Sequence, residues 1–125
     1  MMKMIIRMND YKIAKDNQYS LQDIYNTLNH MFLTVGLPRI ESEANALTYV
    51  DNGRAEDFSL FGQIVNVLKK QSWFMDNVSA WLLYEKDDDD TSDTFTEEDL
   101  LEHYTVNNYR QGSGYISNTT FLNNK

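Results

Sequence analysis

Apolar residues recur at helical spacing in several stretches of this 125-residue chain, most clearly between residues 21 and 35. Their spacing of three or four positions forms one stripe, made up of Leu21, Ile24, Leu28, Met31, Phe32 and Val35. Ser20 precedes the stripe as an N-cap, with Asp23 three residues on. Gly36 and Pro38 follow it as a helix stop. The pattern predicts a helix with one face against a core.

Two further stretches have the same periodicity. Residues 54–70 carry a stripe that ends in two lysines, where positive charge suits the helix dipole; the apolar members are Phe58, Phe61, Ile64, Val65 and Leu68. Residues 72–85 fit a helix that begins at Ser72, although Trp81-Leu82-Leu83-Tyr84 also fits a buried strand. We predict a helix for residues 54–70. For residues 72–85 the length of the stretch favours a helix over a strand.

Residues 40–51 fit either a short helix or a strand. Ile40, Ala44, Leu47 and Val50 are at helical spacing, whereas Leu47 to Val50 followed by Asp51-Asn52-Gly53 resembles a strand that enters a turn. We favour the helix. A last short helix is expected from Leu100, after the capping signal Thr96-Glu97-Glu98-Asp99.

These elements predict a mainly α fold, a small single-domain bundle of about four or five helices with room for a minor β-hairpin. We divide the chain into an N-terminal segment (1–19), a helical domain (20–104) with an acidic loop (85–95), and a polar tail (105–125) rich in asparagine. With 42% hydrophobic residues, the chain has enough apolar material for one core. Neither a signal-peptide core nor an apolar run of about 18 residues is found, so we expect a cytoplasmic protein that does not enter a membrane.

The negative charge of the protein is concentrated in one stretch. Residues 85–102 hold ten acidic residues and a single lysine, a local net charge of −9, while the whole chain has a net charge of −8. The rest of the chain is therefore close to neutral. This charge exceeds what solubility demands of a small domain, which makes the stretch the main candidate for a functional site.

Three interpretations of this stretch compete. It can be a solvated linker between two elements. It can be a calcium site, since Asp87, Asp89, Asp93 and Glu98 have the positions of EF-hand ligands, but Ser92 stands where the loop needs glycine. It can also be a contact surface for a basic partner, because clustered carboxylates produce a potential comparable to that of a phosphate backbone. The calcium site fits the residues least well of the three.

The residues for most catalytic chemistry are absent. The chain has no cysteine, which excludes disulfides, thiolate catalysis and the usual structural zinc sites. Its two histidines, His30 and His103, are expected on the surface, and no phosphate loop, zinc-protease motif or nucleophile elbow is found. We expect no enzyme, no catalytic residue, no metal site and no cofactor.

Two further features of the sequence bear on binding, an aromatic cluster and a possible helix-turn-helix. The aromatic residues Trp73, Phe74, Trp81 and Tyr84 are more typical of a core than of an interface, although Tyr84 directly precedes the acids. A helix-turn-helix around Gly36 would place Glu41 and Glu43 on the helix that reads DNA, where they would repel phosphate. Arg54, Lys69 and Lys70 form only a thin basic group, so direct nucleic-acid binding is not expected.

The short, acidic, cysteine-free chain with its run of aspartates and asparagine-rich end resembles small proteins of bacterial phages and mobile elements. It is similar in character to anti-CRISPR and anti-restriction inhibitors. The resemblance implies an inhibitor that mimics DNA and occupies the basic nucleic-acid-binding surface of a partner, such as a CRISPR-Cas nuclease. The residues implied are Asp87, Asp88, Asp89, Asp90, Asp93, Glu97, Glu98, Asp99 and Glu102, with Tyr84 as an apolar anchor.

Two other functions stay open. The chain can be a helical transcriptional regulator or accessory factor of a mobile element, or a subunit whose acidic loop is only a spacer. Glu97, Glu98 and Asp99 have a local reason to be acidic as helix-capping residues. The functional hypothesis therefore depends chiefly on Asp87 to Asp90 and Asp93. Nothing in the sequence predicts an oligomeric state.

Overall fold

A five-stranded antiparallel sheet forms the centre of the computed structural model, which describes residues 1–43, 45–86 and 95–106. The strand order is β2-β3-β1-β4-β5. Along the chain the elements are β1 (Met2–Met8), α1 (Asp10–Asp16), α2 (Leu21–Thr34), β2 (Arg39–Ile40), β3 (Ala46–Val50), α3 (Asp57–Leu68), α4 (Ser72–Met75), β4 (Val78–Glu85), β5 (Thr96–Asp99) and α5 (Leu100–Val106). The mainly α bundle predicted from the sequence, and with it the description of the protein as helical, is therefore wrong.

Strand β1 occupies the middle of this sheet, although no strand was predicted within residues 1–19. Its side chains alternate: those of the four residues Met2, Met4, Ile6 and Met8 are buried, and those between them are half-buried. Period-two alternation is the mark of a strand with one covered face. The segment was missed because its strand structure depends on pairing with β3 and β4, which local residues do not reveal.

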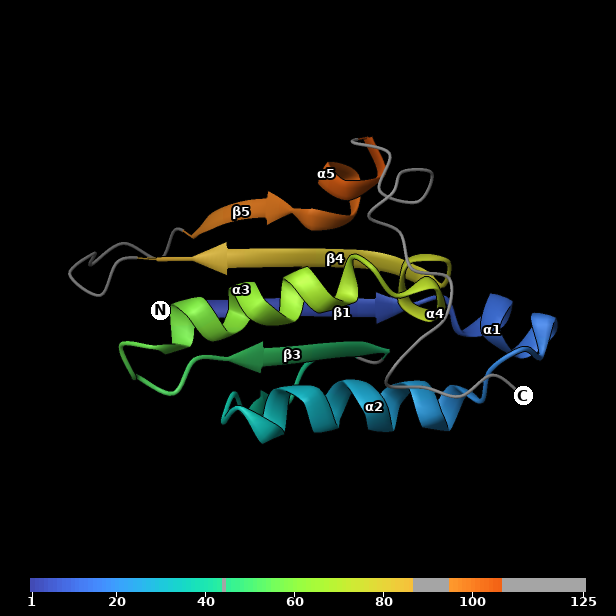
Figure 1. Cartoon of the computed structure of the whole chain (residues 1–125), viewed down its shortest axis with the longest axis horizontal. Coiled ribbons are helices and arrows are strands. Elements are labelled where there is room, and N and C mark those ends of the chain that lie inside the picture. The colour runs from blue at the N-terminus through green and yellow to red at the C-terminus, as the bar shows by residue number, and fades with distance from the viewer. Residues whose placement is uncertain (44, 87–94, 107–125) are drawn as a thin grey trace.

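The helices cover one face of the sheet. Figure 1 shows α2 and α3 lying across it, with α3 in front of β1. The register places Met4 beside Tyr49 and Leu83, and Ile6 beside Leu47 and Trp81, so all these side chains point to the helix side. On that side the ring of Phe32 from α2 stacks on Tyr49, with centroids 3.7 Å apart. The core lies between the sheet and the helices.

The two longest helices match their predictions. Helix α2 begins after Ser20, whose Oγ accepts a hydrogen bond from the backbone N–H of Asp23 at 3.3 Å, as predicted. It ends before Gly36, which has φ +80°, a value that glycine adopts without strain. Helix α3 lies within the predicted range 54–70 and buries its stripe, except for Phe58 at the N-terminal end.

The two segments in which helix was preferred over strand are mostly strands. Within 40–51, Ile40 ends β2 and residues 46–50 form β3; within 72–85, only the four residues of α4 are helical and β4 follows. Both strands pair with β1, and this long-range pairing overrides weak local helical spacing. The DNA-reading helix of a helix-turn-helix is therefore absent, because Glu41 and Glu43 lie between β2 and β3.

Phe32 connects α2, α3 and the sheet, because it stacks on Tyr49 and also contacts Phe61 with ring centroids 6.4 Å apart. It is fully buried. Phe32→Ala is expected to lower the free energy of unfolding by about 3–5 kcal/mol through loss of apolar burial and the cavity left behind. Denaturant unfolding followed by circular dichroism measures this change.

Phe58→Ala is the matched control, since the Phe58 side chain is 63% exposed on α3. It should change the free energy of unfolding by less than about 0.5 kcal/mol. Equal losses in the two variants would contradict this account of the core.

Candidate functional site

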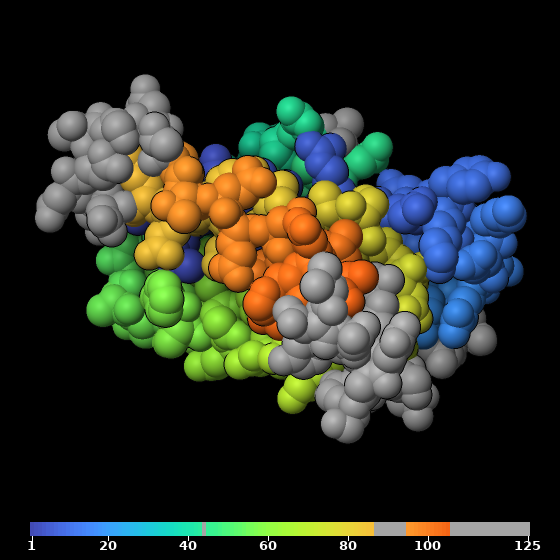
Figure 2. Space-filling view, turned by 90° about the horizontal axis from the view of Figure 1, so that it is seen from above, coloured from blue at the N-terminus to red at the C-terminus, as the bar shows by residue number. Residues whose placement is uncertain are grey.

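Strand β5 forms one edge of the sheet and is acidic along most of its length. Its four residues are all exposed, and three of them are carboxylates. Together with their acidic neighbours on β4 and α5 they form a surface that we call the acidic edge: Glu85, Glu97, Glu98, Asp99 and Glu102. Figure 2 shows β5 and α5 in orange on the face of the molecule that this edge occupies. Four of the predicted partner-binding residues thus lie together.

The other predicted acids, Asp87, Asp88, Asp89, Asp90 and Asp93, lie outside the described residues, and so do three of the four EF-hand positions. Glu98, the remaining EF-hand position, is part of β5. In the described part of the chain, no group of three or more histidine, cysteine, aspartate or glutamate side chains is arranged to hold a metal ion.

Successive carboxylates of the acidic edge point to opposite sides of the sheet. Glu97 is opposite Tyr84 and Asp99 opposite Leu82, both on the side away from α2 and α3. Glu98 is opposite Leu83, on the helix side. The edge therefore presents negative charge to both sides of the sheet, as expected for period-two alternation along an edge strand.

None of the acidic-edge carboxylates forms an ion pair with a lysine or arginine of the described ranges. The nearby cations contact rings instead. Lys3 Nζ lies 4.6 Å from the ring centroid of Phe95 and 5.3 Å from that of Tyr84, and Lys86 Nζ lies 5.7 Å from Phe95. Cation–π contacts of this kind are weak at exposed sites. Within residues 1–43, 45–86 and 95–106, the carboxylates of the edge thus have no lysine or arginine as a counter-ion.

Asp99 has a structural role as well. Its Oδ1 accepts a hydrogen bond from the backbone N–H of Glu102 at 3.0 Å, and α5 begins at the next residue, the buried Leu100. The predicted start of the helix at Leu100 is confirmed. The preceding residues 96–99 form a strand, however, so only Asp99 caps the helix.

Tyr84, the predicted apolar anchor, lies half-buried beside the acidic edge. Its ring meets that of Phe95 edge-on, with centroids 6.4 Å apart. Burial raises the pKa of the Tyr84 phenol, and the hydrogen bond to Glu97 and the negative charge of that carboxylate raise it further. The other aromatic residues weighed with it, Trp73, Phe74 and Trp81, are fully buried, which confirms that they belong to the core.

Both histidines are exposed, as predicted. His30 lies beside an apolar hollow between α2 and α3, and His103 contacts Tyr104 edge-on in α5. A polar hollow near α1 includes Tyr25 and Asn29. Its groups bind one another: the hydroxyl of Tyr25 donates to Asp10, and that of Tyr49 donates to Asn29, both at 2.6 Å. This internal pairing gives the polar hollow a structural role.

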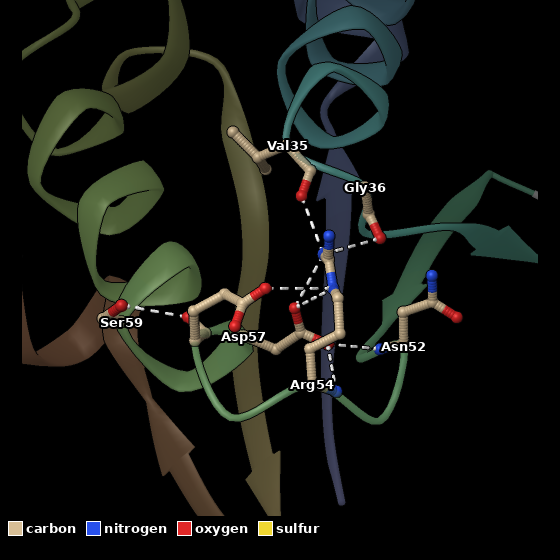
Figure 3. Close-up of polar contacts among 7 residues, drawn as sticks. Val35, Gly36, Asn52, Arg54, Asp57 and Ser59 are labelled. Carbon is tan, nitrogen blue, oxygen red and sulfur yellow. Dashed lines mark hydrogen bonds and ion pairs between the residues drawn. The ribbon is translucent and has the colours of Figure 1, made fainter.

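An ion pair between the exposed Arg54 and the buried Asp57, missed by the sequence analysis, connects the end of α2 with the start of α3 (Figure 3). Arg54 Nε donates to Asp57 Oδ1 at 2.8 Å, and its Nη2 donates to the carbonyl oxygens of Val35 at 2.8 Å and Gly36 at 3.1 Å. Asp57 Oδ2 accepts the backbone N–H of Asn52 at 2.6 Å. We call this group the α2–α3 clasp. The guanidinium of Arg54 is therefore occupied by contacts within the chain, although its side chain is 37% exposed.

The clasp explains two features of its neighbours. A Cβ atom on Gly36 would lie 2.8 Å from the Arg54 guanidinium, so glycine is required there by contact as well as by φ. Asp57 is only 2% exposed. Burial alone would raise its pKa, but the hydrogen bonds from Asn52 and Arg54 and the charge of Arg54 outweigh burial and lower the pKa below its ordinary value.

Comparisons with protein-family models, with curated proteins and with solved structures find no match to this chain. The interpretation of the acidic edge therefore depends on the chemistry of its own residues. Over the described ranges, no helix is long and apolar enough to cross a membrane.

The lowered pKa of Asp57 makes the stability of the protein depend on pH. A carboxyl whose folded-state pKa lies below its unfolded value stabilises the fold above the unfolded pKa, and this contribution is lost as the pH falls through the folded pKa. Asp57→Asn should therefore lower stability at pH 7 and flatten the fall of stability below about pH 4. Urea unfolding at several pH values measures both effects.

Glu56→Gln is the control for this variant, because Glu56 lies 3.8 Å from Arg54 Nε but is 60% exposed. It should change the free energy of unfolding at pH 7 by less than about 0.5 kcal/mol. If Asp57→Asn had the stability and pH profile of the unaltered protein, the clasp would not contribute to folding.

The Tyr84 phenol offers a direct test of the geometry of the acidic edge. Glu97→Gln should lower the pKa of Tyr84, yet leave it above the ordinary value because burial, the largest cause, remains. Glu98→Gln should leave this pKa unchanged, since Glu98 points to the other side of the sheet. Titration of the ¹³C-labelled tyrosines by NMR measures the pKa of Tyr84 in each variant. Equal changes of this pKa in the two variants would contradict the register of β4 and β5.

Proposed function

We propose that this protein is a non-enzymatic, cytoplasmic inhibitor that binds another protein through its acidic edge. The acidic edge, with Asp87, Asp88, Asp89, Asp90 and Asp93, occupies the basic nucleic-acid-binding surface of a partner such as a CRISPR-Cas nuclease and stands in for DNA. The protein uses no cofactor and does not bind nucleic acid itself. Tyr84 lies at the border of the surface as an apolar anchor, an arrangement common at protein interfaces.

The single observation that carries this proposal is the row of carboxylates on β5 that form no ion pair with the described residues. Glu97, Glu98 and Asp99 are consecutive, exposed and free of ion pairs with described residues. Residues of an antiparallel strand rise by about 3.4 Å each. One strand of B-DNA carries a charge about every 3.4 Å of its axis. Over these residues the edge therefore matches the linear charge density of one DNA strand.

The cost of this arrangement supports the same function. Neighbouring carboxylates repel one another, and pairing with lysine or arginine in a complex relieves the repulsion. A charged edge strand also prevents pairing with other chains, but one or two charges are sufficient for that. A local net charge of −9 in residues 85–102 goes well beyond it.

The proposal is tested by competition for DNA. A panel of purified CRISPR-Cas nucleases would be assayed for DNA binding by gel shift, with increasing amounts of this protein present. We expect inhibition of at least one member, weaker at high salt because the contact is ionic. Two variants remove the charge: one replaces Asp87 to Asp90 together by Asn, and the other combines Glu97→Gln with Glu98→Gln. Each should weaken inhibition at least tenfold and reduce its salt dependence. The melting temperature should change little.

The control matched to the Glu97, Glu98 variant removes two charges elsewhere: Asp23→Asn combined with Glu56→Gln, two exposed residues of the helix layer. This double variant should inhibit as well as the unaltered protein. Asp99 is left intact because it caps α5. Inhibition that survives neutralisation of both acidic groups, or a protein that itself shifts DNA on the gel, would refute the proposal.

A further inference from the structure

Asn52 and Gly53 lie in an exposed turn between β3 and α3. Asn52 is the one asparagine of the chain that is followed by glycine. Both residues are exposed, and the φ of Gly53 is +76°. A Cβ atom placed on Gly53 would meet nothing within 4 Å, so the space on that side of the residue is open. In such a turn the backbone nitrogen of the glycine can reach the side-chain amide of the asparagine before it.

The two groups that would react with each other are not held by hydrogen bonds. Among the residues that the structure describes, the side-chain amide of Asn52 and the backbone N–H of Gly53 have no hydrogen-bond partner. In Figure 3 the dashed line at Asn52 ends on its backbone nitrogen, and its side chain extends away from Arg54 and Asp57. Glycine also has no side chain that would hinder attack by its own nitrogen. Both groups are therefore free to react.

We propose that Asn52 is a site of spontaneous deamidation. Hydroxide removes the proton from the backbone nitrogen of Gly53, and this nitrogen attacks the side-chain carbonyl carbon of Asn52. The new bond between nitrogen and carbon closes a cyclic imide. The bond from that carbon to the amide nitrogen breaks, and ammonia leaves after taking a proton from water. A second water molecule opens the imide at either carbonyl, which gives aspartate or isoaspartate at position 52. Solvent is the only co-reactant.

Isoaspartate would disrupt the part of the α2–α3 clasp that spans this turn. The backbone N–H groups of Asn52 and Arg54 both donate to Asp57 Oδ2, at 2.6 and 3.3 Å. These two N–H groups stand on either side of the bond that reacts. In isoaspartate the main chain passes through the former side chain, so it is one carbon longer between them. The two groups can then no longer converge on one oxygen in the same way.

Aspartate at this position would keep the main chain but add a negative charge to the turn. The added charge follows Asp51, whose Oδ2 accepts the backbone N–H of Met2 at 2.7 Å. It also lies in the same turn as Asp57, which is only 2% exposed. Like charges repel one another, and a buried charge is screened less than an exposed one. Both products are therefore expected to weaken the clasp, isoaspartate more than aspartate.

The experiment is incubation of the full chain in warm, mildly alkaline buffer, sampled over several weeks. Ion-exchange chromatography should show a growing species with one more negative charge, and peptide mass spectrometry should place the modification at Asn52. A higher pH should speed its formation, because hydroxide removes the Gly53 proton. Asn66, which is exposed on α3, is the internal control. It should react at least about tenfold more slowly, because the nitrogen of Val67 belongs to the helix and its side chain is branched.

The melting temperature of the purified modified fraction tests the effect on the clasp. It should lie about 3–8 °C below that of the unaltered protein, as expected for the loss of one or two hydrogen bonds in a domain of this size. Asn52→Gln should melt as the unaltered protein does, since Asn52 contributes only its backbone N–H to the clasp. In Asp57→Asn the same modification should lower the melting temperature by less, because the acceptor has already lost its charge.

Three results would overturn the proposal: modification of Asn52 no faster than that of Asn66, the same acidic species formed at the same rate by Asn52→Gln, or a modified fraction that melts with the unaltered protein. The last would show that the turn reacts without any effect on the clasp. The inference does not depend on the proposed inhibitor function, since Asn52 is not part of the acidic edge.

Discussion

Pairing of β1 on both of its edges is the constraint on which the rest of this structure depends. The strand bonds to β3 on one side and β4 on the other, although β4 is more than seventy residues away in the sequence. The alternation of β1 then decides which face is covered, because Met4 and Ile6 point to the side where α2 and α3 pack. Burial of that side supplies most of the apolar area removed from water.

The same alternation determines what the other side can do. Lys3, Ile5 and Arg7 point away from α2 and α3, and a row of residues on that side runs from Ile40 through Thr48 and Ile5 to Leu82. Strand β5 closes the far edge with carboxylates that lack counter-ions among the described residues. One small sheet therefore separates three environments: an apolar core, a mixed open face and a negatively charged edge.

Local signals in the sequence predicted the elements that depend on local chemistry. Helix α2 was recognised from Ser20, its apolar stripe and Gly36, and the start of α5 from Asp99. The strands were missed because they depend on distant partners. The local pattern fits either helix or strand at Leu47 to Val50 and at Trp81 to Tyr84, and pairing with β1 decides for strand. The acidic stretch was recognised by its charge alone, whereas the Arg54–Asp57 pair has no sequence signature.

The separation between β1 and β4 has a consequence for how the chain is made. Residues 2–8 are synthesised before both of their partner strands, and the second of these, β4, is complete only when residue 85 has been synthesised. Until then β1 has at most β3 beside it, and its other edge offers unpaired backbone groups. Non-local pairing of this kind slows folding relative to helical bundles of the same length. The nascent chain therefore passes through a stage at which an apolar strand edge is open to pairing with other chains.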